Sequence, residues 1–205
     1  MSDRRPLWLR TAPGRVPAVT TGATRFRLDE RWPTVVGLLV AAAVCIAVIL
    51  GVDTDEDFTP GIATMMGIYL AAYAIGTPAS AWRASVVLIL IAAVVGEFGV
   101  DAGVVMTAVL GLLWLWVLVR GRAGDTPWFT IQTLGMAFFG GLTIAAVVAD
   151  ARLAGVLAGI GWLTHGVWDA YHFATDRVVV RSWSAMCAAV DIPVGTVLIV
   201  VSLIR

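Results

Sequence analysis

The chain has 205 residues, of which 60% are hydrophobic and 14% are charged, and the charges balance to a formal net charge of zero. This composition is more apolar than that of a soluble domain, and apolar stretches long enough to cross a bilayer recur along the sequence. The sequence holds no phosphate-binding loop, dinucleotide-binding motif or nucleic-acid-binding module, so we expect no nucleic acid partner. It predicts an all-α, polytopic transmembrane helical bundle that contacts the lipid bilayer directly.

All fourteen basic residues are arginine, and the sequence contains no lysine. A retinal cofactor is held as a Schiff base on a lysine, so a rhodopsin-like photoreceptor or pump is excluded. Catalysis by a lysine amine is excluded for the same reason.

Residues 1–33 form the first region of the chain. They hold seven arginines and four prolines with little apolar periodicity, which predicts a mostly disordered basic cytoplasmic tail. Such a tail can contact anionic lipid headgroups at about 1 kcal/mol per arginine, and the alternative is that it acts only as a topology signal. The basic stretch is too long for a cleavable signal peptide, so the first apolar span is expected to stay as an anchor.

Residues 34–205 form the second region, a predicted seven-helix transmembrane domain. Its apolar runs are bounded by charged or turn-forming residues, and the tight turn from Glu97 to Gly103 separates the third run from the fourth. If that turn were a break inside one helix, the number of helices would be six. The predicted spans are 34–52, 61–77, 82–98, 103–119, 130–149, 153–173 and 183–203.

The arginines also predict an orientation. Twelve of the fourteen lie in the amino-terminal tail and the even-numbered loops, and only Arg152 and Arg205 lie elsewhere. Basic residues are retained on the cytoplasmic side, so we expect a cytoplasmic amino terminus and an external carboxyl terminus in a bacterial inner (plasma) membrane. Tryptophans favour the same orientation, since most of them fall near the predicted cytoplasmic helix ends. They are Trp32, Trp82, Trp114, Trp116, Trp128, Trp168 and Trp183.

Ionisable side chains gather on the last two predicted helices. His165, Asp169 and His172 lie within about 60° of one another on one face of the sixth helix, at about 100° of rotation per residue. Cys187 and Asp191 lie one turn apart on the seventh helix, at about the same depths from the cytoplasmic loop as Asp169 and His165. Because the connection between these two helices is short, we expect them to be antiparallel neighbours. Polar groups in lipid are costly and tend to be functional, so chemistry is expected here.

Imidazole, carboxylate and thiolate groups are ligands that zinc and iron accept. We therefore expect His165, Asp169, His172, Cys187 and Asp191 to form a metal site near the cytoplasmic face, holding zinc or iron. A metal with an open position activates water, which favours a metal-dependent membrane enzyme acting on a lipid or another amphiphile. Two alternatives stay open: a proton-coupled or metal-ion transporter, and a structural or accessory membrane subunit without catalytic activity.

Small residues on the sixth predicted helix indicate close helix packing. Gly155 and Gly159 are four residues apart, and Gly166 follows. Such a patch lets a neighbouring helix approach closely or supports a homo-oligomer. The two cysteines, Cys45 and Cys187, fall inside predicted spans and are expected to remain free thiols.

Overall fold

The structure is a computed structural model that describes residues 28–52 and 58–205. Of the basic tail predicted for residues 1–33, positions 1–27 lie outside the described residues. Within the described residues the chain forms seven α-helices and no strand, which confirms the predicted all-α class. The helices are α1 (Leu28–Leu50), α2 (Thr59–Ile75), α3 (Ala81–Glu97), α4 (Ala102–Val119), α5 (Thr126–Val147), α6 (Ala151–Thr175) and α7 (Arg181–Ile204), with short 3-10 turns η3 (Pro78–Ser80) and η4 (Arg122–Gly124).

The turn between α3 and α4 is real, so the six-helix alternative is wrong. Gly99 takes a positive φ of 68°, a conformation that costs glycine little. Asp101 then caps α4, since its side chain accepts a hydrogen bond from the backbone N–H of Val104 at 3.0 Å. A cap of this kind satisfies a backbone donor that the first helical turn leaves unpaired.

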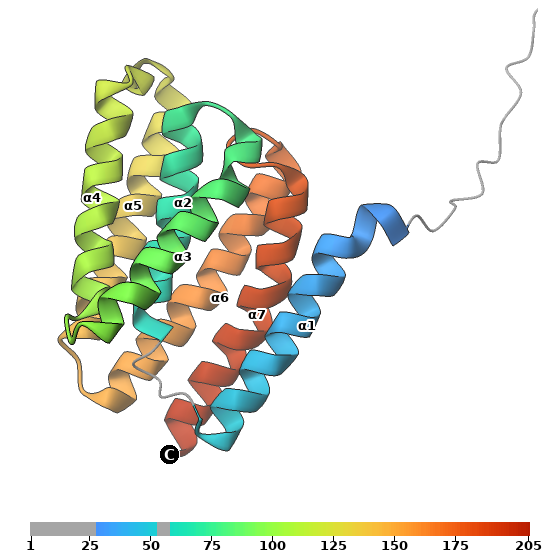
Figure 1. The fold of residues 1–205 in the computed structure, drawn as a ribbon, viewed down its shortest axis with the longest axis vertical. Helices are drawn as coiled ribbons and strands as arrows, with labels where there is room; N and C mark the ends of the chain where they lie inside the picture. Colours follow the sequence, from blue (N-terminus) through green and yellow to red (C-terminus); the bar gives the residue numbers. More distant parts are fainter. Residues whose placement is uncertain (1–27, 53–57) are drawn as a thin grey trace, which may run out of the picture.

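Helix α2 is the interior helix of the bundle. It packs against α3, α4, α5 and α6, as Figure 1 shows, and most of its residues are buried. With 17 residues it is as short as α3 and shorter than α4, α5 and α6. A helix that is apolar all round belongs in such a position.

Five helices, α1, α3, α4, α5 and α7, are long and apolar enough to cross a membrane. The other two are the interior helix α2 and α6, which carries the buried histidines. Large apolar side chains cover the outside of the bundle, with Leu39 67% exposed and Leu112 65% exposed. This arrangement indicates a membrane protein whose outer helix faces contact lipid.

Glycines bring α6 and α7 into close contact. A Cβ atom on Gly195 would lie 2.5 Å from the backbone nitrogen of Leu163, and one on Gly159 would lie 2.8 Å from the carbonyl oxygen of Gly195. These contacts confirm that α6 and α7 are neighbours. The small residues of α6 therefore allow close packing between two helices of the same chain. Helix α1 packs on the far side of α7, where Gly37 approaches the carbonyl oxygen of Met186.

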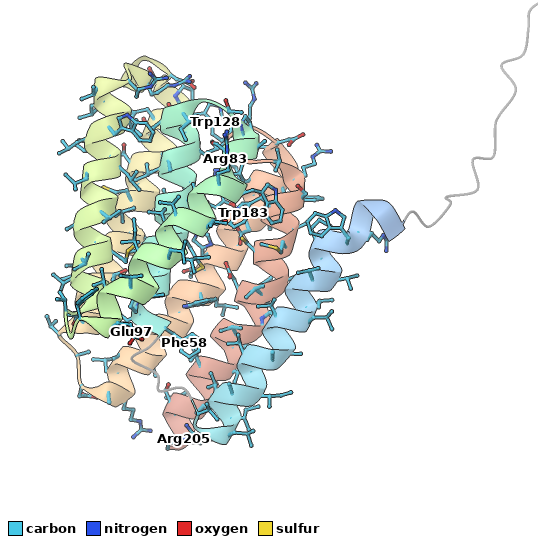
Figure 2. All side chains as sticks on the ribbon, viewed as in Figure 1. Phe58, Arg83, Glu97, Trp128, Trp183 and Arg205 are labelled. Carbon is cyan, nitrogen blue, oxygen red and sulfur yellow. The ribbon has the colours of Figure 1, made fainter. Side chains whose placement is uncertain are left out.

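The two ends of the bundle differ. One, the arginine-bearing end, holds the start of α3, α5 and α7, and Figure 2 shows Arg83, Trp128 and Trp183 there. Trp82 stacks on Trp32 at 5.6 Å and meets Trp183 edge-to-face at 4.9 Å between ring centroids. Glu97, Phe58 and Arg205 lie at the opposite end.

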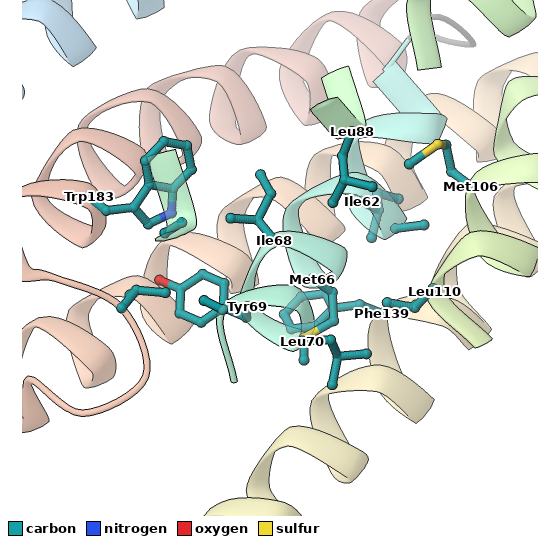
Figure 3. Packing of buried hydrophobic residues seen from close by; sticks show 14 of the residues in the cluster. Ile62, Met66, Ile68, Tyr69, Leu70, Leu88, Met106, Leu110, Phe139 and Trp183 are labelled. Atoms are coloured by element: carbon teal, nitrogen blue, oxygen red, sulfur yellow. The ribbon is translucent and has the colours of Figure 1, made fainter. Parts of the chain in front are cut away.

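An apolar layer fills the middle of the bundle. It consists of side chains from α2, α4 and α5, shown in Figure 3, each at most 2% exposed. They are Ile62, Met66, Met106, Leu110 and Phe139, which we call the apolar layer. This layer separates the two ends of the bundle within the described residues.

Candidate metal centre

Three of the predicted site residues meet at one point. His165 and Asp169 on α6 and Asp191 on α7 place possible ligand atoms within 4.8 Å of one another, and all three side chains are buried. His165 Nδ1 lies 3.0 Å from Asp191 Oδ2 and 3.5 Å from Asp169 Oδ2. We call these residues the triad. Their meeting confirms the predicted convergence of α6 and α7.

Helix geometry explains the triad. His165 and Asp169 are one turn apart on α6 and so share a face. Asp191 reaches them from α7 because Gly166 of α6 leaves room for Ile192, the residue after Asp191. A Cβ on Gly166 would lie 2.6 Å from Ile192 Cγ1.

Tyr69 of the interior helix α2 orients Asp169. Its hydroxyl donates to Asp169 Oδ1 at 2.5 Å, and its ring packs edge-on against His165 and His172. Tyr69 is fully buried, and Figure 3 shows its hydroxyl at the edge of the core. The bond uses one carboxylate oxygen and leaves Asp169 Oδ2 on the side of His165. A partner of this kind fixes a metal ligand and tunes its affinity.

His172 lies beside the triad but is not part of it. Its Nδ1 lies 2.9 Å from the carbonyl oxygen of Trp168, which only accepts, so Nδ1–H is the donor. Its Nε2 lies 3.0 Å from the Gln132 amide nitrogen and accepts from it. Both ring nitrogens therefore have protein partners, and Gln132 of α5 joins the network.

Cys187 also lies outside the triad. Its thiol is free and half-buried on α7, packed against the hydrophobic core. The carboxylates of Asp169 and Asp191 are close enough to interact electrostatically with this thiol. Cys45 is a free, half-buried thiol on α1, so neither cysteine forms a disulfide, as expected.

Several buried polar atoms around the triad have no hydrogen-bond partner. Buried polar groups are normally paired, so a concentration of unpaired ones indicates a site built for something besides helix contact. Among the described residues these atoms belong to α5, α6 and α7. They are Gln132 Oε1, His165 Nε2, Trp168 Nε1, Asp169 Oδ2, Trp183 Nε1 and Ser184 Oγ.

The charges and distances of the triad suit a divalent cation. Two buried carboxylates have His165 as their only ion-pair partner among the described residues, so a doubly charged ion would balance them. Ligands about 2.0 to 2.2 Å from a tetrahedral zinc lie roughly 3.3 to 3.6 Å from one another. The 3.5 Å separation of His165 Nδ1 and Asp169 Oδ2 lies in this range, while the 3.0 Å separation of His165 Nδ1 and Asp191 Oδ2 is that of a hydrogen bond. The group could therefore hold a metal ion.

An apolar groove lies against the site on the outside of the bundle. It has a volume of about 450 Å³ between α5 and α6, and Phe139 and Trp168 line it. The same two rings form the wall toward the site, since Phe139 lies 5.0 Å from the His165 ring and Trp168 lies 4.7 Å from the His172 ring. Phe139 and Trp168 thus line the groove and also contact the histidine rings of α6.

A larger cavity of about 630 Å³ lies at the opposite end of the bundle. Thr59, Thr64 and Asp101 line it together with alanines and glycines. The apolar layer lies between this cavity and the triad. The cavity therefore does not reach the polar site through the described residues.

Two residues of the site, Tyr69 and Gln132, are not among those expected from the sequence. Both are polar side chains inside otherwise apolar predicted spans, and that is a signal for a buried role. Their partners lie 100 and 40 residues away, so spacing along one helix could not identify them.

Comparison of the chain with models of protein families, with curated proteins and with solved structures finds no match.

Proposed function

We propose that the protein is a metal-dependent membrane enzyme that acts on a lipid or another amphiphile. Its metal, zinc or iron, is bound by the triad of His165, Asp169 and Asp191. The observation that carries the proposal is the meeting of three buried ligand groups from two helices. Three protein ligands leave a position open for water or substrate, as in catalytic metal sites.

The unpaired atoms of the site support a ligand over a purely structural role. A cluster that only joins helices would pair its own polar atoms, because each unpaired one costs free energy in the interior. Here His165 Nε2 and Asp169 Oδ2 have no hydrogen-bond partner, and Asp169 Oδ2 has only the ion pair with His165 Nδ1 at 3.5 Å. A structural subunit does not explain these two atoms.

The groove between α5 and α6 supports an amphiphilic substrate. It is apolar and faces the lipid side of the bundle, so an acyl chain can enter it without leaving the membrane. From there the aromatic wall of Phe139 and Trp168 leads to the triad. The reacting group of the amphiphile would reach the metal by displacement of this wall.

The reaction class that suits the site is hydrolysis of an ester or amide. A metal ion held by the triad would make water a stronger nucleophile toward the acyl carbon. The water oxygen bonds to that carbon, the bond from the carbon to the leaving oxygen or nitrogen breaks, and the proton passes to the leaving group. Tyr69 is a positioning residue in this proposal, since its hydroxyl donates to Asp169 of the triad.

Transport explains the structure less well than catalysis. A transporter needs a path across the whole bundle, and polar groups would line it. The apolar layer interrupts any such line between the 630 Å³ cavity and the triad. The triad lies buried on one side of this layer, which fits a one-sided enzyme.

The enzyme proposal is tested with purified, zinc-loaded protein and 4-nitrophenyl palmitate in mixed micelles, followed by release of 4-nitrophenol. Wild type should hydrolyse the ester, and His165→Ala should lower the rate by a factor of about 100 or more, because a ligand is lost. His172→Gln is the matched control and should retain most of the activity. Zinc-loaded wild type that hydrolyses no faster than His165→Ala would overturn the enzyme proposal.

We also propose that the arginine-bearing end faces the cytoplasm. The first helix and the last one run in the same direction along the bundle, so the chain ends at the opposite end from the start of α1 (Figure 1). A reporter fused after Arg205 should therefore be exported, and one fused before α1 should stay inside. Both reporters on the same side would contradict this orientation.

A further inference from the structure

A second, smaller cavity lies at the arginine-bearing end, outside the triad. Its volume is about 120 Å³, and it is lined by the end of α2 and by the loops that join α4 to α5 and α6 to α7. Two arginines, Arg122 and Arg177, line it from different loops, together with Tyr73, Trp128 and Asp125. The cavity thus brings two positive charges and one negative charge to one place.

Arg122 is held in position at this cavity. Its guanidinium lies over Gly76, where a Cβ atom would overlap it, so only glycine permits this placement. Gly76 takes a positive φ of 77° at the end of α2, which glycine also favours. The backbone of Arg122 is fixed too, because Tyr73 donates its hydroxyl to the Arg122 carbonyl oxygen at 3.0 Å.

Neither arginine of the cavity is paired with a carboxylate. Arg181, on the same end, forms an ion pair with Asp176 at 3.4 Å, whereas Arg122 and Arg177 form none among the described residues. Asp125 lines the cavity as well and lowers its positive charge without cancelling it. Unpaired guanidinium groups at a concave site are suited to bidentate binding of a phosphate.

The cavity is connected to the candidate metal centre by one aromatic side chain. Trp128 lines the cavity, and its ring lies 6.2 Å from the rings of both His172 and Tyr171. Tyr171 in turn lines the apolar groove between α5 and α6. A headgroup in the cavity would therefore lie beside the groove proposed for the chain of an amphiphile.

We propose that this cavity binds the phosphate group of a phosphate-bearing molecule, through Arg122 and Arg177. The phosphate can come from a lipid headgroup or from free phosphate, and the chemistry of recognition is the same. Binding itself does not depend on the metal. The role of the cavity in recognising a phospholipid substrate rests on the proposed function.

The test measures binding to the full-length protein in detergent by native mass spectrometry. Phosphatidic acid and phosphatidylcholine with identical chains are compared for wild type, Arg177→Gln and Arg181→Gln. Arg177 is exposed, so its loss should leave the fold intact, and Arg181→Gln is the matched control because that arginine is already paired. We expect Arg177→Gln to weaken phosphatidic acid binding about tenfold or more, since a charge-assisted hydrogen bond is lost, and Arg181→Gln to change it less than about twofold.

Inorganic phosphate distinguishes the two sources. Competition by millimolar phosphate that depends on Arg177 would support a site for the phosphate group itself. Arg177-dependent binding of phosphatidic acid without such competition would support a lipid headgroup site. Equal loss in Arg177→Gln and Arg181→Gln, or no loss in either, would overturn the proposal, because the attraction would then be that of a basic surface in general. Zinc content measured on the same samples separates this result from a failure of the metal site.

Discussion

The two ends of the bundle are built differently. Around the triad, Gly166 of α6 lets Ile192 of α7 approach closely, and Tyr69 and Gln132 add hydrogen bonds from the helices around them. At the opposite end, alanines and glycines line a cavity of about 630 Å³. Small residues thus serve opposite purposes, since they bring α6 and α7 together around the triad and leave the opposite end of the bundle hollow.

This difference indicates which part of the bundle carries the function. Polar groups are costly inside a membrane protein, and here they are concentrated on one side of the apolar layer. A one-sided site suits chemistry on a molecule that arrives from one leaflet. The following predictions test whether the two ends really differ in this way.

The largest effect is expected where α6 and α7 touch. Gly195→Ala should destabilise the protein by about 3 kcal/mol. The added methyl group would overlap backbone atoms of α6, which cannot move aside as a flexible side chain can. It should also separate His165 from Asp191 and lower metal binding. Thermal unfolding in detergent and metal analysis measure both effects.

The control for that prediction is Gly141→Ala on α5. A Cβ there meets nothing within 4 Å, so the change should be neutral or stabilise the helix by up to about 1 kcal/mol. Equal melting temperatures for the two variants would show that the α6–α7 contact is looser than described.

The next effect is expected at the tyrosine that orients Asp169. Tyr69→Phe removes the hydrogen bond to Asp169 Oδ1 and should lower metal affinity by a factor of about 10 to 100. Its cost in stability should be about 0.6 to 1.7 kcal/mol, as for hydrogen bonds between membrane helices. Zinc titration with a competing chelator measures the affinity.

Tyr73→Phe is the matched control, since Tyr73 lies one turn further along α2 and bonds the loop at Arg122. It should leave zinc affinity within about twofold, because it orients no metal ligand. A loss as large as that of Tyr69→Phe would mean that α2 supports the site only through general packing.

The smallest effect is expected at the hollow end. Ala92→Leu would fill part of the 630 Å³ cavity and should change stability by no more than about 0.5 kcal/mol, with hydrolysis and metal content unchanged. A transport path would have to pass through this cavity. Activity that disappears in Ala92→Leu while the protein remains folded would therefore favour the transporter.

Most of the fold could be predicted from the sequence because charged and turn-forming residues separate the apolar runs. Asp101 and Asp150 cap α4 and α6, and both lie at predicted boundaries. Helix α5 begins at Thr126, four residues before the predicted span, and its first turn accommodates Pro127 because proline is favoured there. Helix α1 begins at Leu28, six residues before the predicted span, and includes Pro33.

The candidate site was predicted in part. Helical periodicity placed His165 and Asp169 on one face, and depth matching paired His165 with Asp191. Helical periodicity could not show that His172 lies outside the triad, because the Nε2 atom of His172 is hydrogen-bonded to Gln132 on another helix. Contacts between helices distant in sequence are decided by packing, which a single sequence does not display.

Metal content tests the central claim most directly. Wild type purified without chelators and analysed by elemental mass spectrometry should carry one zinc or iron ion per chain, and Asp191→Asn, which keeps the shape but not the charge of the ligand, should carry almost none while still folding. Wild type that holds no stoichiometric transition metal, even after incubation with zinc and iron, would contradict the account.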